Sequence, residues 1–147
     1  MFKRVLIANR GEIAIRISRA AAALGVESVA VYAPADALSL HAKLATTARE
    51  IGGGATLASD PVRTYLDVEA IIAAAKESGS DCVHPGYGVL CENANFAERC
   101  RGEGLRFIGP TPAPPAWSII LPDAPLFRPL GGESVALYAP AALAFGA

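Results

Sequence analysis

The segment His84-Pro85-Gly86-Tyr87-Gly88 has the residue types of a turn that contacts a ligand. Glycine lacks a side chain, so Gly86 and Gly88 let the backbone come close to a ligand or to another segment. A structural turn would explain the two glycines equally well, but it explains less well why Tyr87 is presented between them. His84 ends an apolar segment, and we interpret it as a structural histidine rather than as a general base. Tyr87 and its flanking glycines are therefore the first candidate site.

Charged residues on one side of a predicted helix form a second candidate. Glu12, Arg16 and Arg19 are spaced at i, i+4 and i+7, which places them on one helix face. A Glu–Arg pair at this spacing stabilises a helix by only about 0.2–0.5 kcal/mol. We interpret the face either as a solvated surface or as a protein interface, where paired arginines are favoured.

Two further positions are weaker candidates. The turn Asn9-Arg10-Gly11 lies where a dinucleotide-binding loop would lie, and Asp36 follows the second predicted strand as a ribose-binding acid would. The G-x-G-x-x-G pattern is incomplete, and Glu12 would place a negative charge near a phosphate, so we favour a packing turn. Cys91 precedes a predicted helix whose dipole favours a thiolate, but no base is nearby in sequence. We assign no catalytic residue.

The sequence lacks the usual devices for binding a nucleoside triphosphate or a metal. It has no P-loop, no lysine set in a glycine-rich loop and no carboxylate cluster suited to Mg²⁺. The spacing of Cys82, Cys91 and Cys100 matches no zinc site, and we interpret the three as free thiols in a reducing cytoplasm.

Charge and hydropathy exclude further classes of protein. The net charge is −1 and no basic stripe is present, which argues against a nucleic-acid partner. No apolar run reaches the roughly 18 residues of a membrane span. The N-terminus leads directly into a predicted strand, so we expect neither a membrane segment nor a signal peptide.

Alternating apolar segments and amphipathic segments predict the framework that positions these residues. The predicted strands cover residues 5–8, 28–32, 48–51, 81–84 and 106–108, and the predicted helices cover residues 13–24, 37–47, 65–78 and 93–101. The apolar face of the first helix is predicted to comprise Ile13, Ile17, Ala20, Ala21 and Leu24. A capping box at Thr64 and Asp67 is predicted to open the third helix. This order is typical of a Rossmann-like α/β fold, a parallel sheet flanked by helices, in which ligands bind beyond the carboxyl ends of the strands.

The sequence changes character at Pro112. Seven of the eleven prolines lie from this residue onward, and Asp123, Arg128 and Glu133 are the remaining charged residues there. Proline at this density excludes a long helix. We place a domain boundary near Pro112, with a folded domain over residues 1–112 and an irregular Pro/Ala-rich tail over residues 113–147.

Three segments resemble the N-terminal, pre-ATP-grasp domain of biotin carboxylases. They are KRVLIANRGEIAIRI (Lys3–Ile17), HPGYGVLCENANFAE (His84–Glu98) and FIGPT (Phe107–Thr111). The resemblance covers residues 1 to about 112 and implies part of a ligase that uses ATP, Mg²⁺ and bicarbonate to carboxylate biotin. It also implies a homodimer partner, together with the biotin carboxyl carrier and carboxyltransferase components of the acyl-CoA and pyruvate carboxylases.

The resemblance implies roles for five residues. Tyr87, with Gly86 and Gly88, matches the turn that borders the biotin and bicarbonate pocket. Arg16 and Arg19 match arginines at the homodimer interface of the family, which agrees with the interface interpretation of their helix face.

The resemblance has two departures. Cys91 stands where the family usually has serine, and the likeness ends after Thr111. The ATP-binding lysines, the Mg²⁺-binding glutamates and the base that deprotonates bicarbonate belong to the part of the family pattern that follows. We therefore expect a truncated or frame-shifted biotin carboxylase subunit that is inactive by itself and that binds none of biotin, ATP and Mg²⁺ tightly on its own. Two alternatives stay open: a non-catalytic module that docks on a full-length carboxylase subunit, and a nucleotide-binding domain of an oxidoreductase.

Overall fold

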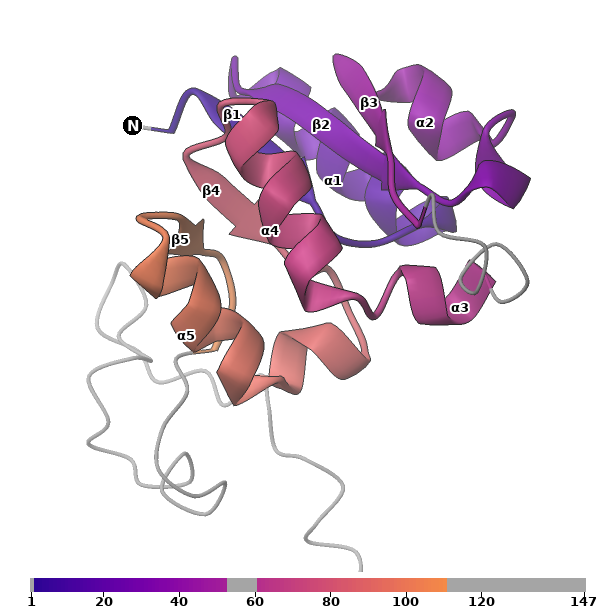
Figure 1. Cartoon of the computed structure of the whole chain (residues 1–147). Helices are drawn as coiled ribbons and strands as arrows, with labels where there is room; N and C mark the ends of the chain where they lie inside the picture. Colours follow the sequence, from indigo (N-terminus) through magenta and orange to yellow (C-terminus); the bar gives the residue numbers. More distant parts are fainter. Residues whose placement is uncertain (1, 53–60, 111–147) are drawn as a thin grey trace, which may run out of the picture. The chain divides into compact units, whose positions relative to one another are not determined.

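The computed structural model describes residues 2–52 and 61–110, and these residues build one parallel sheet flanked by helices (Figure 1). The sheet has five strands in the order β3-β2-β1-β4-β5, and every neighbouring pair is parallel. The strands are β1 (Arg4–Ile7), β2 (Glu27–Tyr32), β3 (Thr47–Glu50), β4 (Cys82–His84) and β5 (Arg106–Phe107). The helices are α1 (Gly11–Ala23), η1 (Pro34–Asp36), α2 (Leu40–Leu44), α3 (Pro61–Thr64), α4 (Val68–Glu77), η2 (Val89–Glu92) and α5 (Ala94–Gly102). The predicted parallel α/β fold is confirmed.

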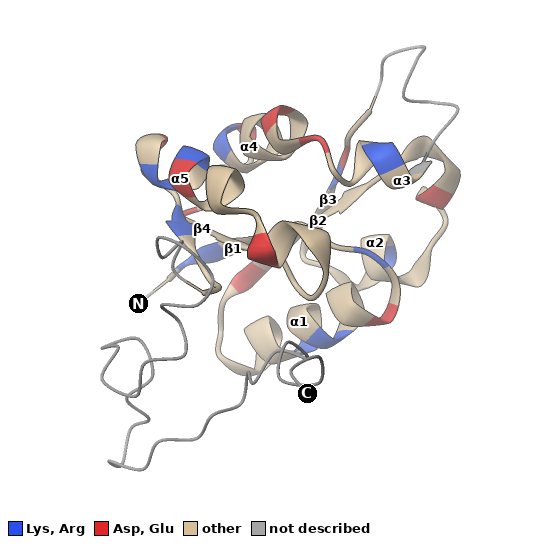
Figure 2. Ribbon diagram, turned by 90° about the horizontal axis from the view of Figure 1, so that it is seen from below, with Lys and Arg blue, Asp and Glu red and all other residues tan. Residues whose placement is uncertain are grey.

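Helices cover both faces of the sheet (Figure 2). The helices α4 and α5 lie on one face of the sheet, and the helices α1 and α2 lie on the other. Because successive strand residues point to opposite faces, Leu6 joins the core beneath α4 and α5, while Val5 packs with Ala21 of α1. Central strands buried in this way on both faces have the continuous apolar sequences seen at β1 and β2.

Helix α1 is buried through small side chains rather than through the predicted aliphatic face. Its buried residues are Ala14, Ser18 and Ala21. Leu24 is 66% exposed and Ala20 is exposed as well, so the predicted face was correct only at Ala21 and in part at its two isoleucines. Small residues let the helix lie close to the sheet, and the larger aliphatic side chains are left at the margins of the contact.

The region after β2 differs from the prediction because side chains end the helix early. A single helix was predicted over residues 37–47, but α2 ends at Leu44 and β3 begins at Thr47. The Thr46 hydroxyl accepts a hydrogen bond from the Ser28 N–H at 3.0 Å, and the Ser28 hydroxyl accepts one from the Thr46 N–H at 3.1 Å. This reciprocal pair fixes the chain against the edge of β2 and starts the next strand.

The predicted capping box is wrong, because Thr64 ends α3 instead of starting α4. Asp67 is itself the N-cap, and its carboxylate accepts a hydrogen bond from the Ala70 N–H at 3.0 Å. The residues between the two helices bring Tyr65 to the end of β2, where its hydroxyl accepts a hydrogen bond from the Ala33 N–H at 3.1 Å.

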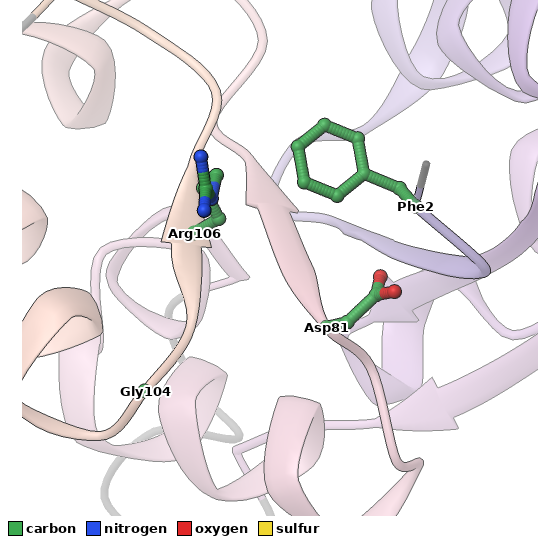
Figure 3. A pocket seen from close by; sticks show the side chains of 4 residues that line it. All are labelled: Phe2, Asp81, Gly104 and Arg106. Carbon is green, nitrogen blue, oxygen red and sulfur yellow. The ribbon is translucent and has the colours of Figure 1, made fainter.

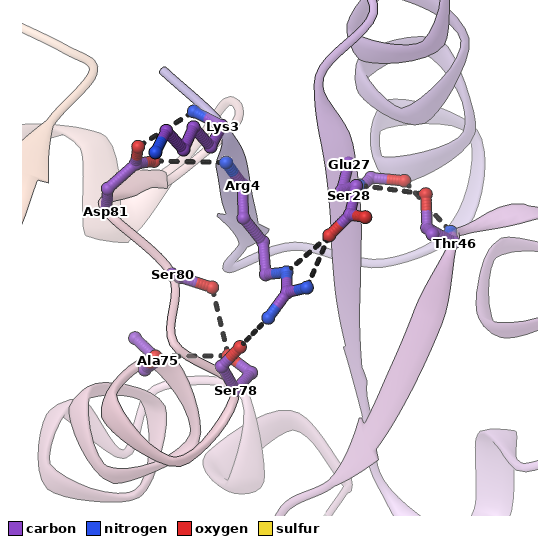
Figure 4. A network of polar contacts seen from close by, with 9 residues as sticks. All are labelled: Lys3, Arg4, Glu27, Ser28, Thr46, Ala75, Ser78, Ser80 and Asp81. Atoms are coloured by element: carbon purple, nitrogen blue, oxygen red, sulfur yellow. Dashed lines mark hydrogen bonds and ion pairs between the residues drawn. The ribbon is translucent and has the colours of Figure 1, made fainter.

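The amino-terminal edge of the sheet is fixed by a polar network (Figure 4). The Arg4 guanidinium pairs with Glu27 and donates to the Ser78 carbonyl, while the Asp81 carboxylate accepts from the N–H groups of Lys3 and Arg4 at 2.7 and 3.2 Å. Partial burial raises the pKa of Asp81, but these backbone donors outweigh it, so the pKa lies below its ordinary value. These contacts join β1 to β2 and to the start of β4, and we assign them a structural role.

No helix in the described ranges combines the length and apolar content needed to cross a bilayer. The predicted tail over residues 113–147 lies outside the described residues, and the boundary near Pro112 stays a prediction.

Candidate functional site

The candidate site lies where strand order reverses in the sheet. From β1 the chain moves outward to β2 and β3, and it then returns to place β4 on the other side of β1. Ile7 of β1 is level with His84 of β4, and the Ala8 N–H donates to the His84 carbonyl at 2.9 Å. Asn9 and Pro85 therefore leave the sheet side by side, at the position where open α/β sheets bind ligands.

Asn9 connects the two loops at this point. Its Nδ2 donates to the Pro85 carbonyl at 2.9 Å and to the Tyr87 carbonyl at 3.0 Å, and its Oδ1 accepts from the Arg10 N–H at 2.9 Å. From the sequence alone, Asn9 is expected only as part of a turn. Its polarity was visible in the sequence, but the bonds span 76 and 78 residues and follow only from the pairing of β1 with β4.

The glycines of the turn are required by geometry. Gly86 has φ 71° and Gly88 has φ 113°, values that other residues rarely adopt. A Cβ atom on Gly86 would lie 2.5 Å from Asn9 Nδ2, so the backbone approaches another segment closely here. The Gly86 N–H also donates to Nδ1 of His84 at 3.0 Å.

His84 has the properties of a structural histidine. Burial lowers the pKa of His84 and favours the neutral ring. Because Nδ1 accepts a hydrogen bond from Gly86, the proton of the neutral ring is on Nε2. This supports the interpretation made from the sequence.

Tyr87 presents its side chain to solvent. The residue is 71% exposed, and Val89 beside it is 69% exposed, whereas Leu90 is buried and anchors the segment that follows. An aromatic ring on a fixed backbone gives a flat, apolar surface with a polar end. The turn therefore offers one wall for a ligand at the carboxyl edge of the sheet.

Asp36 is occupied by neighbouring residues. Its carboxylate accepts hydrogen bonds from the Tyr65 hydroxyl at 2.8 Å and the Ser39 hydroxyl at 3.3 Å, and Arg10 lies 3.4 Å away. Burial raises the pKa of Asp36, but Tyr65 and the Arg10 charge outweigh it and hold the pKa below its ordinary value. This arrangement favours a structural role and disfavours the ribose-binding role of the oxidoreductase alternative.

Tyr65 forms a cluster with Arg10 and Asp36. It was not expected there, because the sequence places it in the helix predicted over residues 65–78. The Arg10 guanidinium lies 5.6 Å from the centre of the Tyr65 ring, a cation–π distance. Burial raises the pKa of the Tyr65 hydroxyl, and the neighbouring Asp36 carboxylate raises it further. The hydroxyl therefore stays protonated as the donor to Asp36.

Arg16 and Arg19 lie apart from the turn, on the exposed side of α1. Arg16 is 4.0 Å from Glu12, and the two side chains are 76% and 83% exposed, so the pair contributes little to stability. The exposure suits either interpretation of this face, and the dimer-interface assignment stays a prediction.

The cysteines are free thiols, as predicted. Cys82 and Cys100 are fully buried, and burial raises the pKa of Cys82 to about 12 and that of Cys100 to about 11. Cys91 is half-buried. Among residues 2–52 and 61–110, no group of three or more His, Cys, Asp or Glu side chains is arranged to bind a metal ion.

A depression lies at the amino-terminal edge of the sheet (Figure 3). It is lined by Phe2, Asp81, Gly104 and Arg106. Its carboxylate, Asp81, already accepts hydrogen bonds from the backbone of Lys3 and Arg4. We therefore assign it no functional role.

We expect the free energy of unfolding to decrease as the pH is lowered from 7.5 to 5.5. Burial lowers the folded-state pKa of both His41 and His84, so the unfolded chain takes up protons first, near the ordinary value of about 6.5. This contribution to stability is complete above that pH and is lost as the pH falls toward the folded-state values. Urea unfolding at pH 7.5, 6.5 and 5.5 measures the slope, and His41→Asn should reduce it. A free energy that stays constant across the three pH values would contradict the expectation.

Residues 1–114 match the family described as "Biotin carboxylase, N-terminal domain". Biotin carboxylase 2 of Bacillus subtilis is 52% identical over 112 residues, which cover 76% of this chain and 24% of that protein. The chain therefore spans about a quarter of the length of this curated relative.

Solved structures give the same result. The biotin carboxylase domain of a single-chain bacterial carboxylase has a TM-score of 0.66 at 53% identity, covering 75% of this chain and 24% of that one. The biotin carboxylase domain dimer of Hydrogenobacter thermophilus 2-oxoglutarate carboxylase, in complex with MgADP, ADP and bicarbonate, has a TM-score of 0.69 at 44% identity, covering 81% and 24%.

Proposed function

This chain belongs to the biotin carboxylase family, and from that membership we propose that it forms the first domain of a biotin-dependent carboxylase. In this role the Gly86-Tyr87-Gly88 turn borders the pocket for biotin and bicarbonate. The observation that carries the proposal is the exposed Tyr87, which stands on a fixed turn at the point where the sheet reverses its strand order. The remainder of such an enzyme would supply the other walls of the pocket.

The residues of the turn fit one side of a biotin site. The exposed ring of Tyr87 offers apolar contact area, and its hydroxyl offers a hydrogen bond at the rim. When bound, biotin supplies the ring nitrogen that is carboxylated. The part played by this chain is to orient the ligand and to exclude water from one side.

The described residues do not fit Mg·ATP. Phosphoryl transfer depends on metal ions and cationic side chains that hold the phosphates, and the described ranges contain no metal-binding group of acidic or histidine side chains. We propose that the parts of a carboxylase that this chain does not span bind the nucleotide.

We propose that α1 provides an interface with a second carboxylase subunit through Arg16 and Arg19. Both arginines are exposed, as is Leu24 at the end of the same helix, and such a mixture of arginine and apolar surface is typical of interfaces. Dimerisation of a relative's biotin carboxylase domain supports this role. Docking of the free chain on a complete carboxylase subunit would use the same surface. Carrier and carboxyltransferase partners, and a cytoplasmic location, belong to the same proposal.

The purified chain is expected to show no biotin-dependent ATP hydrolysis. Placed in Bacillus subtilis biotin carboxylase 2 instead of that enzyme's own matching segment, residues 1–112 should restore hydrolysis that depends on biotin and bicarbonate. The measurement is phosphate release with and without biotin, compared with the unaltered enzyme. Turnover by the purified chain alone would contradict the expected inactivity, and a folded hybrid without activity would contradict the assignment as its first domain.

A further inference from the structure

The side-chain amide of Asn9 is fully engaged at the candidate site. Both carbonyl groups that it binds, those of Pro85 and Tyr87, flank Gly86, and its own oxygen accepts from the Arg10 N–H. A reversed amide would place Oδ1 against two carbonyl oxygens and Nδ2 against an N–H group. The contacts therefore fix the orientation of the amide, and Asn9 connects the end of β1 to both sides of the Gly86 position.

The turn is also held from within its own segment. The Gly86 N–H donates to Nδ1 of His84 at 3.0 Å, and burial keeps that ring neutral by lowering its pKa. Gly86 lies so close to Asn9 that the space for a Cβ is already filled. The backbone on both sides of Tyr87 Cα is thus fixed, whereas its ring extends into solvent.

We propose that Asn9 is a positioning residue for Tyr87, which fixes the turn in the place from which the tyrosine ring meets biotin. The part that concerns biotin depends on the proposed function; the part that concerns the turn does not. A ligand-contacting ring that is already held in place loses less conformational freedom on binding than a ring on a mobile turn. Loss of Asn9 should therefore weaken binding without removing any group that touches the ligand.

Asn9→Asp is the sharpest change to the contact. The two side chains have nearly the same shape, and a carboxylate can still accept from the Arg10 N–H. It cannot donate to the carbonyls of Pro85 and Tyr87, and it brings a negative charge against both. The variant therefore removes the connection to the turn while the space remains filled.

The test uses the full 147-residue chain, labelled with ¹⁵N and with 3-fluorotyrosine, and Tyr87→Phe identifies the fluorine signal of Tyr87. Hydrogen exchange of the Gly86 amide reports on the turn, the Tyr87 signal reports on the ring, and titration with free biotin reports on binding. In Asn9→Asp we expect the Gly86 amide to exchange at least about tenfold faster, the Tyr87 signal to move, and the dissociation constant for biotin to rise about tenfold.

A matched control separates positioning from general loss of stability. Asp67→Ala removes the N-cap of α4, a hydrogen bond from the Ala70 N–H that does not involve the turn, and it should leave the Tyr87 signal and the biotin affinity as in the unaltered chain. If Asn9→Asp leaves Gly86 exchange and the Tyr87 signal unchanged, the inference is overturned. If biotin leaves the Tyr87 signal of the unaltered chain unchanged, the proposed biotin contact is wrong. Hydrogen exchange of the Gly86 amide and the Tyr87 signal in Asn9→Asp still decide whether Asn9 positions the turn.

Discussion

Replacing Gly86 with alanine is expected to lower the free energy of unfolding by roughly 2–4 kcal/mol and to displace the Tyr87 turn. The change meets two obstacles. Gly86 has φ 71°, which strains any residue that carries a Cβ, and the new Cβ would lie 2.5 Å from Nδ2 of Asn9. The Asn9 amide must move to make room for the new Cβ, and this movement weakens its hydrogen bonds to the carbonyls of Pro85 and Tyr87.

Two other glycines separate these contributions. Gly25, which follows α1, has φ 70° but open space around the Cβ position, so Gly25→Ala should show the backbone strain alone, about 1–2 kcal/mol. Gly102 has neither a positive φ nor a close neighbour, and Gly102→Ala should change stability by less than about 0.5 kcal/mol or increase it. Urea unfolding of the three variants gives the comparison. Equal losses for Gly86→Ala and Gly25→Ala would mean that the contact with Asn9 does not constrain the turn.

The order of the elements could be predicted because short parallel strands carry an unambiguous signal. The apolar runs of residues 5–7 in β1 and 29–31 in β2 are buried, as in strands covered on both faces, and each strand is followed within a few residues by a turn. Helices between such strands leave few topologies, since crossovers are right-handed and consecutive strands tend to be neighbours. The carboxyl edge, and with it the region of the Tyr87 turn, followed from this reasoning.

The details that decide helix ends and helix faces could not be predicted from spacing alone. On α1 the aliphatic residues and the small residues both recur at helical intervals, and only packing determines that Ala14 and Ser18 face the sheet. The early end of α2 depends on the hydrogen bonds between Ser28 and Thr46, which lie 18 residues apart. Local patterns do not contain this information.

The candidate site likewise contains some residues whose role the sequence indicates and others whose role only the structure shows. The glycines and the tyrosine of the turn were visible because their residue types are unusual together. The role of Asn9 could not be predicted in this way, because an asparagine after a strand also suits an ordinary turn. Its role depends on which strand lies beside β1. The contact of Arg10 with Asp36 and Tyr65 requires three loops to meet, which no single segment indicates.

Phe96→Ala is expected to lower the free energy of unfolding by about 3–5 kcal/mol, the largest effect that we predict. Phe96 is fully buried in the core between α5 and the sheet, and its ring packs edge-on against Phe107 of β5 with 5.6 Å between ring centres. Truncation leaves a cavity and removes the aromatic contact. Because α5 follows the Tyr87 turn through η2, we also expect faster hydrogen exchange of the Cys91 amide, which donates to the Gly88 carbonyl at 3.0 Å. Urea unfolding and exchange measurements would test the two effects together.

Two further variants distinguish loss of volume from loss of the aromatic pair. Phe96→Leu keeps most of the buried volume, and a double-mutant cycle with Phe107→Leu should give a coupling of about 0.5–1.5 kcal/mol if the edge-on geometry itself contributes. Val89 follows the turn and is 69% exposed, so Val89→Ala should change the free energy of unfolding by less than about 0.5 kcal/mol. A loss below about 1 kcal/mol for Phe96→Ala would mean that α5 is held to the sheet by other contacts, and the position of the Tyr87 turn would then depend on Asn9, His84 and Leu90.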